Sequence, residues 1–265
     1  MSEIDARQVP AFQVHEFGPR RSEYCVCMFV LNENGKLLKQ LERSQPWLHL
    51  ADFVIADGGS TDGSTAPETL RSLGINTLLI KTGPGKLGAQ MRMGFAWALT
   101  RGYKSVVCID GNNKDDPAAI ALIIEKLQSG YDHIQGSRFV PGGVSENLPF
   151  ARWAGLRLLH APLISLASGF HYTDTTNGFR GYSARLLSDP SMAVFRDVFV
   201  SYELHWYLAI RAVKLGFRVC EAPVARRYPR HGPVPTKISP VRGALMMLRL
   251  LFITCLGFYD PKQTA

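Results

Sequence analysis

The feature that most constrains the fold is a regular alternation of apolar runs with amphipathic segments, which starts at Tyr24. Continuous apolar runs of this length are typical of strands that are buried on both faces. The predicted strands are 24–31, 52–56, 77–80, 104–109 and 133–136. The predicted helices between them are 36–43, a short helix opened by Thr65 and Pro67, 87–101 and 117–128. This alternation predicts an α/β fold with a mostly parallel sheet flanked by helices.

The second half of the chain has a different rhythm after about residue 141. A long apolar helix is predicted at 150–168, a further helix at 202–214 and a short strand at 218–222. A basic loop then leads to an apolar C-terminal helix at 239–258. No internal repeat or linker is evident. We therefore expect a surface extension at 1–21, one large domain at 22–238, and an apolar helix with its tail at 239–265.

Charge and cysteine content narrow the choice of partner and compartment. The 265 residues carry a formal net charge of +8, which favours anionic partners such as nucleotide phosphates, nucleic acid or an acidic membrane surface. The five cysteines include no Cys-X-X-Cys pair, so neither a zinc site nor a disulfide framework is indicated. The N-terminus lacks the apolar core of a signal peptide. The longest C-terminal apolar run, 243–259, is interrupted by Arg249 and is shorter than the roughly 20 residues of a spanning helix. We expect a cytoplasmic protein that is soluble or peripheral on the cytoplasmic face of the membrane.

Polar residues follow three of the predicted strands at their carboxyl ends. The first strand is followed by Asn32 and Glu33, the second by the stretch 57–63, and the fourth by the stretch 110–113. One such loop is explained by turn chemistry, because Asp, Asn, Ser and Gly favour turns. Three loops at one edge indicate a binding site, since ligands of open parallel sheets bind beyond the carboxyl ends of the strands.

The motifs within these loops resemble those of family 2 glycosyltransferases. The stretch 57–63 reads Asp-Gly-Gly-Ser-Thr-Asp-Gly and resembles their Asp-Asp-Gly-Ser-Thr-Asp-Gly signature, with Gly58 at the second aspartate. The stretch 110–112 resembles their Asp-X-Asp metal motif, with Asn112 at the second acid.

Two further stretches resemble the dolichol- and polyprenyl-phosphate sugar transferases of that family. Residues 136–139 with 142–143 resemble Gly-Ser-Arg-Tyr…Gly-Gly, and residues 174–180 resemble Asp-Pro-Thr-Ser-Gly-Phe-Arg. The motifs occur in the family's order between about 24 and 237. The resemblance implies the GT-A fold, which is a Rossmann-like, mostly parallel sheet. It also implies transfer of a sugar from a nucleotide-sugar to a polyprenyl phosphate, with help from a metal ion and with inversion.

The resemblance also implies roles for individual residues. The donor-binding residues would be Glu33, Asp57, Lys86 and Asp110, with Glu33 and Asp57 holding the base and ribose. The ligands of Mg²⁺ or Mn²⁺ would be Asp110 and Asn112, since hard cations prefer oxygen. The residues binding acceptor or phosphate would be Arg138, Arg152, Arg180, Arg226, Arg230 and Lys237, because guanidinium groups bind phosphate in a bidentate way. The catalytic residues would be Asp110, Arg138 and Glu203.

Some positions depart from the family's pattern or fit two roles. Where the family often has glutamine, two places after the second metal residue, this chain has Lys114. Glu203 matches an acid of the family, and it would serve as a base if the acceptor were a hydroxyl group. An acceptor phosphate is already ionised and needs no base, in which case Glu203 is a structural residue. Asp115 and Asp116 would add negative charge at the metal motif or cap the helix that follows.

Two other classes of function compete with this interpretation. Gly83, Gly85 and Gly88 match the Gly-X-Gly-X-X-Gly fingerprint of NAD-dependent oxidoreductases, with Asp110 about 20 residues further on. The match lies on the third predicted strand rather than the first, and it leaves the Asp57 loop without a role. The net charge suggests a nucleic-acid-binding protein, but no zinc finger, RNP motif or basic heptad helix supports one. We therefore expect no nucleic-acid partner. Instead, the apolar helices and Trp153 are candidates for contact with a bilayer surface or a membrane-anchored partner.

Overall fold

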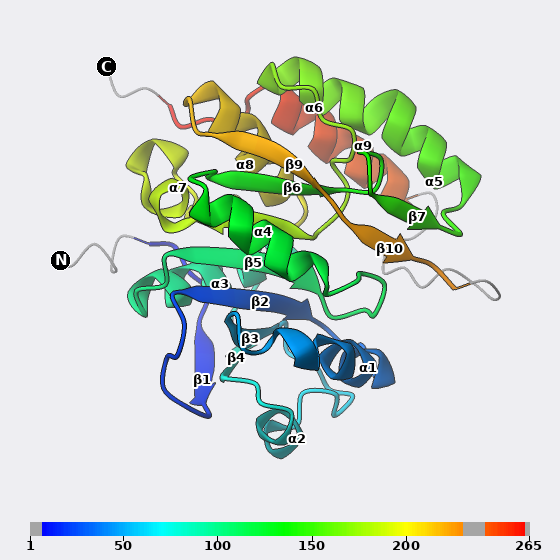
Figure 1. Ribbon diagram of the computed structural model, residues 1–265. Coiled ribbons are helices and arrows are strands. Elements are labelled where there is room, and N and C mark those ends of the chain that lie inside the picture. Colours follow the sequence, from blue (N-terminus) through cyan, green and yellow to red (C-terminus); the bar gives the residue numbers. More distant parts are fainter. Residues whose placement is uncertain (1–6, 230–241, 263–265) are drawn as a thin grey trace.

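The structure is a computed structural model that describes residues 7–229 and 242–262. Within these residues an eight-stranded sheet forms the centre of the molecule, with helices on both faces (Figure 1). The order of its strands is β1-β4-β3-β2-β5-β8-β6-β9. Their bounds are β1 Phe12–Glu16, β2 Tyr24–Val30, β3 Asp52–Asp57, β4 Thr77–Lys81, β5 Ser105–Asp110, β6 His133–Ser137, β8 Arg180–Ser183 and β9 Val219–Pro223. A second, two-stranded parallel sheet pairs β7 (Val144–Glu146) with β10 (Ala225–Arg227).

The predicted parallel core is confirmed. Strand β2 pairs in parallel with β3 on one side and with β5 on the other, and β4 continues the sheet beyond β3. In this register Val30 lies opposite Asp57, and Phe29 lies opposite Asp110. The polar loops after β2, β3 and β5 therefore meet at one edge, where the strand order reverses. Because these loops, residues 32–34, 57–65 and 110–116, carry the predicted donor-binding residues Glu33, Asp57 and Asp110, we call them the donor edge.

Helices cover both faces of the sheet, because the central strands carry apolar side chains on both faces. Their bounds are α1 Gly35–Ser44, α2 Pro67–Ser72, α3 Leu87–Thr100, α4 Ala119–Gln128, α5 Phe150–Gly155, α6 Ala161–Ser168, α7 Ala184–Ser188, α8 Glu203–Lys214 and α9 Arg242–Cys255. Successive residues of a strand point to opposite faces. Cys27 of β2 accordingly packs with α3, α7 and α8, whereas Met28 packs with α1 and α4. Both faces of β2 are buried, in agreement with its continuous apolar sequence.

The N-terminal segment differs from the expected surface extension. Residues Phe12–Glu16 form an edge strand that pairs antiparallel with β4, from Phe12 opposite Lys81 to Glu16 opposite Thr77. Its sequence has no apolar run, because an edge strand with one exposed face does not need one. The segment therefore belongs to the main sheet.

Two further differences lie in the second half of the chain. The helix expected at 150–168 contains a π-helical turn at 156–160 between α5 and α6. Pro162, in the first turn of α6, has no N–H to donate to the carbonyl of Leu158, and such a gap in the helical bonding favours a wider turn. The strand β8, with the sequence Arg-Gly-Tyr-Ser, lies antiparallel between β5 and β6 and was not predicted.

Helices α6 and α9 pack against α8 and form a smaller third layer beside the sheet (Figure 1). Leu251 of α9 packs with Ile164 of α6 and Trp206 of α8 in a separate apolar cluster. Of the C-terminal helix expected at 239–258, residues 239–241 lie outside the described part. No helix in residues 7–229 and 242–262 has the length and hydropathy needed to span a bilayer.

Candidate active site

The loop after β3 is organised around the buried side chain of Asp57. One carboxylate oxygen accepts hydrogen bonds from the backbone N–H groups of Gly59 and Ser60 and from the Ser60 hydroxyl, at 3.1, 2.9 and 2.7 Å. The other oxygen accepts from the Thr65 hydroxyl at 2.9 Å. Gly59 has a φ of 94°, a conformation that favours glycine. Asp57 therefore fixes the shape of its own loop.

The loop after β2 is bonded to the loop after β3. The Asn32 side-chain oxygen accepts from the backbone N–H of Thr61 at 2.8 Å, and the backbone N–H of Asn32 donates to the Ser60 hydroxyl at 2.9 Å. Beneath them, the Gln90 amide donates to the carbonyls of Val30 and Ala56, both at 2.8 Å. These contacts hold the two strand ends at a fixed separation. The loops after β2 and β3 are thus ordered by the protein's own hydrogen bonds.

Glu33 lies in the same loop and is buried. Its carboxylate stands 3.8 Å from the Lys36 ammonium on α1. Glu33 thus lies just beyond the end of β2, and its role at the donor stays a prediction.

Asp110, at the end of β5, lies in a cluster of charged side chains. One of its oxygens accepts from the Arg226 guanidinium and from the Asn112 amide, each at 3.1 Å. Arg226 also bonds the fully buried carboxylate of Asp115. Burial alone would lower the pKa of Arg226, but Asp115 and Asp110 raise it, so the guanidinium stays charged. Gly178 faces the other oxygen of Asp110, and a Cβ at this glycine would lie 2.9 Å from it.

The side chains around Asp110 fit a divalent cation only in part. The side-chain oxygen of Asn112 accepts from the backbone N–H of Lys114 at 3.2 Å, and its amide group donates to Asp110. Asn112 thus directs the N–H donor of its amide toward Asp110, at the position where the family's second aspartate would offer a charged oxygen. Among the described residues no three side chains of His, Cys, Asp or Glu are grouped as metal ligands. Of the two predicted ligands, Asp110 alone offers a charged oxygen.

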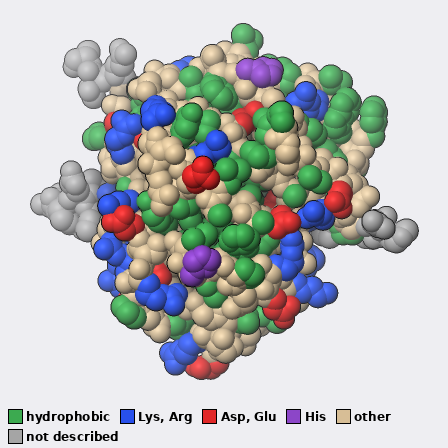
Figure 2. All heavy atoms as spheres, in the orientation of Figure 1, with side chains coloured by type: hydrophobic (Ala, Val, Ile, Leu, Met, Phe, Trp, Pro, Cys, Tyr) green, Lys and Arg blue, Asp and Glu red, His purple; other side chains and the backbone are tan. Residues whose placement is uncertain are grey.

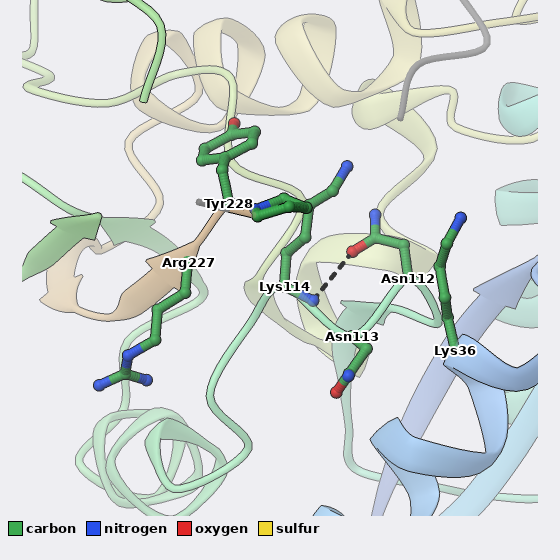
Figure 3. A pocket seen from close by; sticks show the side chains of 7 residues that line it. Lys36, Asn112, Asn113, Lys114, Arg227 and Tyr228 are labelled. Carbon is green, nitrogen blue, oxygen red and sulfur yellow. Dashed lines mark hydrogen bonds between the residues drawn. The ribbon is translucent and has the colours of Figure 1, made fainter. Parts of the chain in front are cut away.

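A pocket of about 290 Å³ opens beside this cluster (Figure 3). Its described lining residues are Lys36, Asn112, Asn113, Lys114, Arg227, Tyr228 and Pro229. Lys114 is nine-tenths buried, and its ammonium lies 5.5 Å from the centre of the Tyr228 ring. Burial and the nearby Arg226 lower the pKa of Lys114 to about 8, against the opposing effect of Asp110. Three of the described lining residues, Lys36, Lys114 and Arg227, carry cationic groups, so the pocket is cationic.

Arg138 and Asp174 form a buried ion pair next to the cluster. The guanidinium of Arg138 donates to both oxygens of Asp174, at 2.6 and 3.0 Å, and also to the hydroxyl groups of Thr176 and Tyr228. Burial alone would raise the pKa of Asp174, but Arg138 holds it below its usual value. This pair ties the end of β6 to the loop 174–179, two segments that the motifs had singled out separately. Tyr228 joins the pair to Arg226, Arg152 and Lys114, since its ring lies within 5.9 Å of all three cations.

The other predicted phosphate-binding residues lie in three different situations. Arg152, on α5, is exposed, and its guanidinium stands 5.9 Å from the centre of the Tyr228 ring. Arg180 is fully buried, and it donates to the backbone carbonyls of Asn177, His205 and Thr175. Such burial argues against direct contact between Arg180 and a phosphate. Arg230 and Lys237 lie outside the described residues.

Glu203 and the backbone of Lys86 both bond to the backbone of Val200, near the start of α3. The buried carboxylate of Glu203 accepts from the backbone N–H groups of Val200 and Ser201. The Val200 carbonyl in turn accepts from the backbone N–H groups of Lys86 and Gly88, at 2.9 and 3.2 Å. The Lys86 side chain is exposed. Glu203 therefore braces the loop 199–202 against α3, as its structural interpretation requires.

The same contacts exclude the dinucleotide site that Gly83, Gly85 and Gly88 suggested. A pyrophosphate at such a site needs the free N–H groups of the helix N-terminus. Here the Val200 carbonyl occupies that position, and a Cβ at Gly88 would lie 2.7 Å from the carbonyl oxygen of Phe199. Gly88 allows the loop 199–202 to pack closely against the start of α3.

Sequence reasoning missed the structural partners of the site. Asp174 and Tyr228 were not named as site residues, and Asp115 was named only as a source of negative charge or a helix cap, although each bonds or stacks on a predicted arginine. The pairing of Asp115 with Arg226 joins residues that are 111 positions apart. The signal available in the sequence was the position of Asp174 inside one recognised motif and of Asp115 three residues after another.

Comparison with known structures supports the GT-A fold. Glucosyl-3-phosphoglycerate synthase from Mycobacterium tuberculosis, solved with uridine diphosphate, superposes with a TM-score of 0.63 at 16% identity, over 91% of this chain and 81% of that chain. The same enzyme has been solved with Mn²⁺, UDP and phosphoglyceric acid, with a TM-score of 0.61 at 16% identity, over 91% of this chain and 80% of that chain. At this identity the likeness concerns the fold.

Comparison with curated sequences identifies relatives, although no family model matches the chain. The polyprenol monophosphomannose synthase of Mycolicibacterium smegmatis is 28% identical over 194 residues, which span 71% of this chain and 70% of that protein. The undecaprenyl-phosphate mannosyltransferase of Micrococcus luteus is 31% identical over 201 residues, which span 73% of this chain and 79% of that protein. With the motifs at the ends of β3, β5 and β6, these similarities establish that the chain belongs to the polyprenyl-phosphate glycosyltransferase family of the GT-A fold.

Proposed function

We propose that this protein transfers a sugar from a nucleotide-sugar to a polyprenyl phosphate. The observation that carries the proposal is the position of the cationic cluster. Arg226, Arg152 and Lys114 surround Tyr228 at the end of β5, between the donor edge and the apolar helix α5. An anionic donor and an anionic lipid headgroup can meet at such a place.

The donor half of the proposed site is the donor edge. Ligands of open α/β sheets bind at the point where the strand order reverses, which here lies between β2 and β5. Glu33 and Asp110 lie in the loops at that point, and Asp57 shapes the neighbouring loop. We assign the nucleotide to the donor edge and its diphosphate to the pocket beside Asp110.

The acceptor half is assigned to Arg152, while Arg138, which is buried and paired with Asp174, holds the loop 174–179 beside it. In the proposed reaction a phosphate oxygen of the lipid attacks the anomeric carbon of the sugar, and the bond from that carbon to the nucleoside diphosphate breaks. The attacking phosphate is already ionised, so no residue has to remove a proton. This is consistent with Glu203, whose carboxylate is directed to the backbone of Val200 and Ser201. A single displacement of this kind inverts the anomeric configuration.

We also propose that a divalent cation takes part in the transfer. Mg²⁺ or Mn²⁺ would neutralise charge on the leaving diphosphate, as Mn²⁺ accompanies UDP in the M. tuberculosis enzyme. In this chain Asp110 would be its charged protein ligand, and Asn112 would have to rotate to offer its carbonyl. Because the protein supplies so few charged oxygens, the ion would bind together with the donor, each strengthening the binding of the other.

The lipid chain of the acceptor needs an apolar surface next to the headgroup. Phe150, Leu158 and Leu166 on the segment α5–α6 are 78%, 71% and 84% exposed. On and after α9, Leu245, Leu256 and Phe258 are also exposed. We call these six side chains the apolar face; Figure 2 shows hydrophobic side chains along the edge of the molecule formed by α5 and α6. We propose that this face lies on the membrane surface, where apolar side chains enter the boundary between headgroups and acyl chains.

A release assay tests the proposed function. Purified protein is incubated with a panel of UDP- and GDP-sugars and Mn²⁺, with polyprenyl phosphate present or absent. One donor should release its nucleoside diphosphate at a rate that rises at least about tenfold when the lipid phosphate is added. Release that is unaffected by the lipid, or stimulated instead by soluble sugars, would favour a hydroxyl acceptor and return Glu203 to the role of base.

A further inference from the structure

The pocket beside Asp110 is lined by cationic side chains, and the metal motif next to it has Asn112 in place of its second carboxylate. Its described lining includes the cations Lys36, Lys114 and Arg227, two asparagines, and no carboxylate. Arg227 is already paired, because its guanidinium donates to Asp116 and Glu146 at 3.0 and 2.9 Å. Lys36 pairs with Glu33 at 3.8 Å. A pocket with this lining attracts an anion more strongly than it attracts a metal cation.

Asn112 and Arg226 reinforce that preference. The amide of Asn112 donates to Asp110 while its oxygen accepts from the backbone of Lys114. The guanidinium of Arg226 pairs with both Asp110 and Asp115, so its single positive charge balances one of their two negative charges. The negative charge that a divalent cation would need is therefore partly compensated before any ligand binds.

Lys114 adds a further positive charge at this position. It is the fourth residue after Asp110, it is nine-tenths buried, and it lines the pocket (Figure 3). The charges that act on it come from Arg226, Asp110, Arg152 and Glu33, so it belongs to the same cluster. A buried ammonium group held beside a phosphate site is a strong point charge for phosphate oxygens.

We propose that Lys114 binds the diphosphate of the nucleotide donor and supplies there part of the positive charge that a divalent cation supplies. The inference rests on the proposed function and names a donor-binding residue for it. Its consequence concerns affinity: the protein holds a nucleoside diphosphate without a divalent cation, and the cation adds to a site that is already cationic. Asp110 and the donor can still recruit the ion for the transfer step.

The test is calorimetric titration of the whole protein with UDP and with GDP, in excess chelator and in Mn²⁺. For the nucleotide that binds, we expect the wild-type affinity in chelator to lie within about fivefold of the affinity in Mn²⁺. Lys114→Gln should weaken binding at least about tenfold in chelator, the effect of one lost charged hydrogen bond. In Mn²⁺ the loss should be clearly smaller, because the ion replaces the missing charge.

Matched variants separate charge from structure. Lys114→Arg should restore most of the binding in chelator, and Lys39→Gln, an exposed lysine on α1, should leave all affinities unchanged. Thermal unfolding of each variant checks that the fold is kept. Wild-type binding that disappears in chelator would overturn the inference, as would equal losses for Lys114→Gln in both conditions. A protein that binds neither nucleotide in either condition, yet is folded, would instead contradict the proposed function itself.

Discussion

The donor edge and the apolar face differ in whether their side chains have partners within the protein. At the donor edge, Asp57, Asp110 and Asp115 are each bonded to donors of the protein itself. At the apolar face, large side chains such as Phe150 and Leu166 remain in contact with solvent. The first region is shaped before a ligand binds. The second leaves apolar area uncovered, which is the usual property of a surface that meets a partner or a membrane. The two regions should therefore respond differently to mutation.

The largest expected effect is that of Asp110→Ala at the donor edge. It removes the charged oxygen from the end of β5 and leaves Arg226 with Asp115 alone. Loss of a preorganised charge at the reacting group costs about 10²- to 10³-fold in rate. We expect that loss both in transfer to the lipid and in slow hydrolysis of the donor. Steady-state rates of the two reactions, with thermal unfolding as the check of folding, measure it. A loss confined to transfer would place Asp110 at the acceptor.

A smaller and more selective effect is expected for Arg152→Ala. Arg152 is exposed on α5 beside Tyr228, so its removal should not disturb the donor edge. Transfer to polyprenyl phosphate should fall about 10- to 100-fold, as for loss of one charged contact to phosphate. Affinity for the nucleotide should change less than about twofold. The matched control is Arg71→Ala on α2, which removes an exposed arginine that also stands over an aromatic ring. Equal effects of the two substitutions would show that Arg152 has no special role.

The apolar face should affect membrane binding rather than stability. The triple variant Phe150→Ser, Leu158→Ser and Leu166→Ser should bind anionic vesicles at least about tenfold more weakly, because less apolar area enters the interface. Its unfolding free energy should change by less than about 1 kcal/mol, since these side chains are exposed in the folded protein. Sedimentation with vesicles measures the binding. The control is Val14→Ser with Val198→Ser, which alters exposed apolar residues elsewhere. Unchanged sedimentation of the triple variant would contradict the assignment.

The smallest expected effect is on the pH dependence of the free energy of unfolding, through the buried side chain of His133. His133 stacks on Tyr182, and burial followed by the charge of Arg180 lowers its pKa well below 6.5. The unfolded chain takes up a proton on His133 below about pH 6.5, whereas the folded chain does not. The contribution of His133 to the free energy of unfolding is thus fully present above about pH 6.5, and it is lost as the pH decreases below that value. The slope is about 1.4 kcal/mol per pH unit for one such group.

Substitution of that histidine tests the assignment. His133→Phe should make the decrease in stability between pH 7.5 and 5.5 smaller by roughly 1 kcal/mol. Denaturant unfolding at the two pH values measures the difference. Identical pH dependence of the variant and the wild type would show that another group governs the acid response.

The sequence predicted the parts of the fold that depend on local pattern. The apolar runs of β2, β3 and β5 identify buried parallel strands, and the polar residues that follow them identify the donor edge. The edge strand β1 and the short strand β8 have no apolar run, so periodicity could not reveal them.

Within the candidate site, the motifs indicated which residues matter, but they could not indicate how each is used. Arg152 and Arg180 are both predicted phosphate-binding arginines, yet the first is exposed beside Tyr228 and the second bonds buried backbone carbonyls. The partners that decide this are far away in the sequence. The tertiary structure is needed to separate a guanidinium that can meet a phosphate from one that supports a loop.

The most direct test of the central claim is identification of the transfer product. The protein is incubated with Mn²⁺, the donor found in the release assay, and vesicles that contain polyprenyl phosphate or, in parallel, the same polyprenol without phosphate. Mass spectrometry of the extracted lipids should reveal a polyprenyl phosphate heavier by one sugar residue, and no product from the polyprenol. A sugar attached to the polyprenol hydroxyl, or consumption of the donor with the lipid phosphate unchanged, would contradict the account.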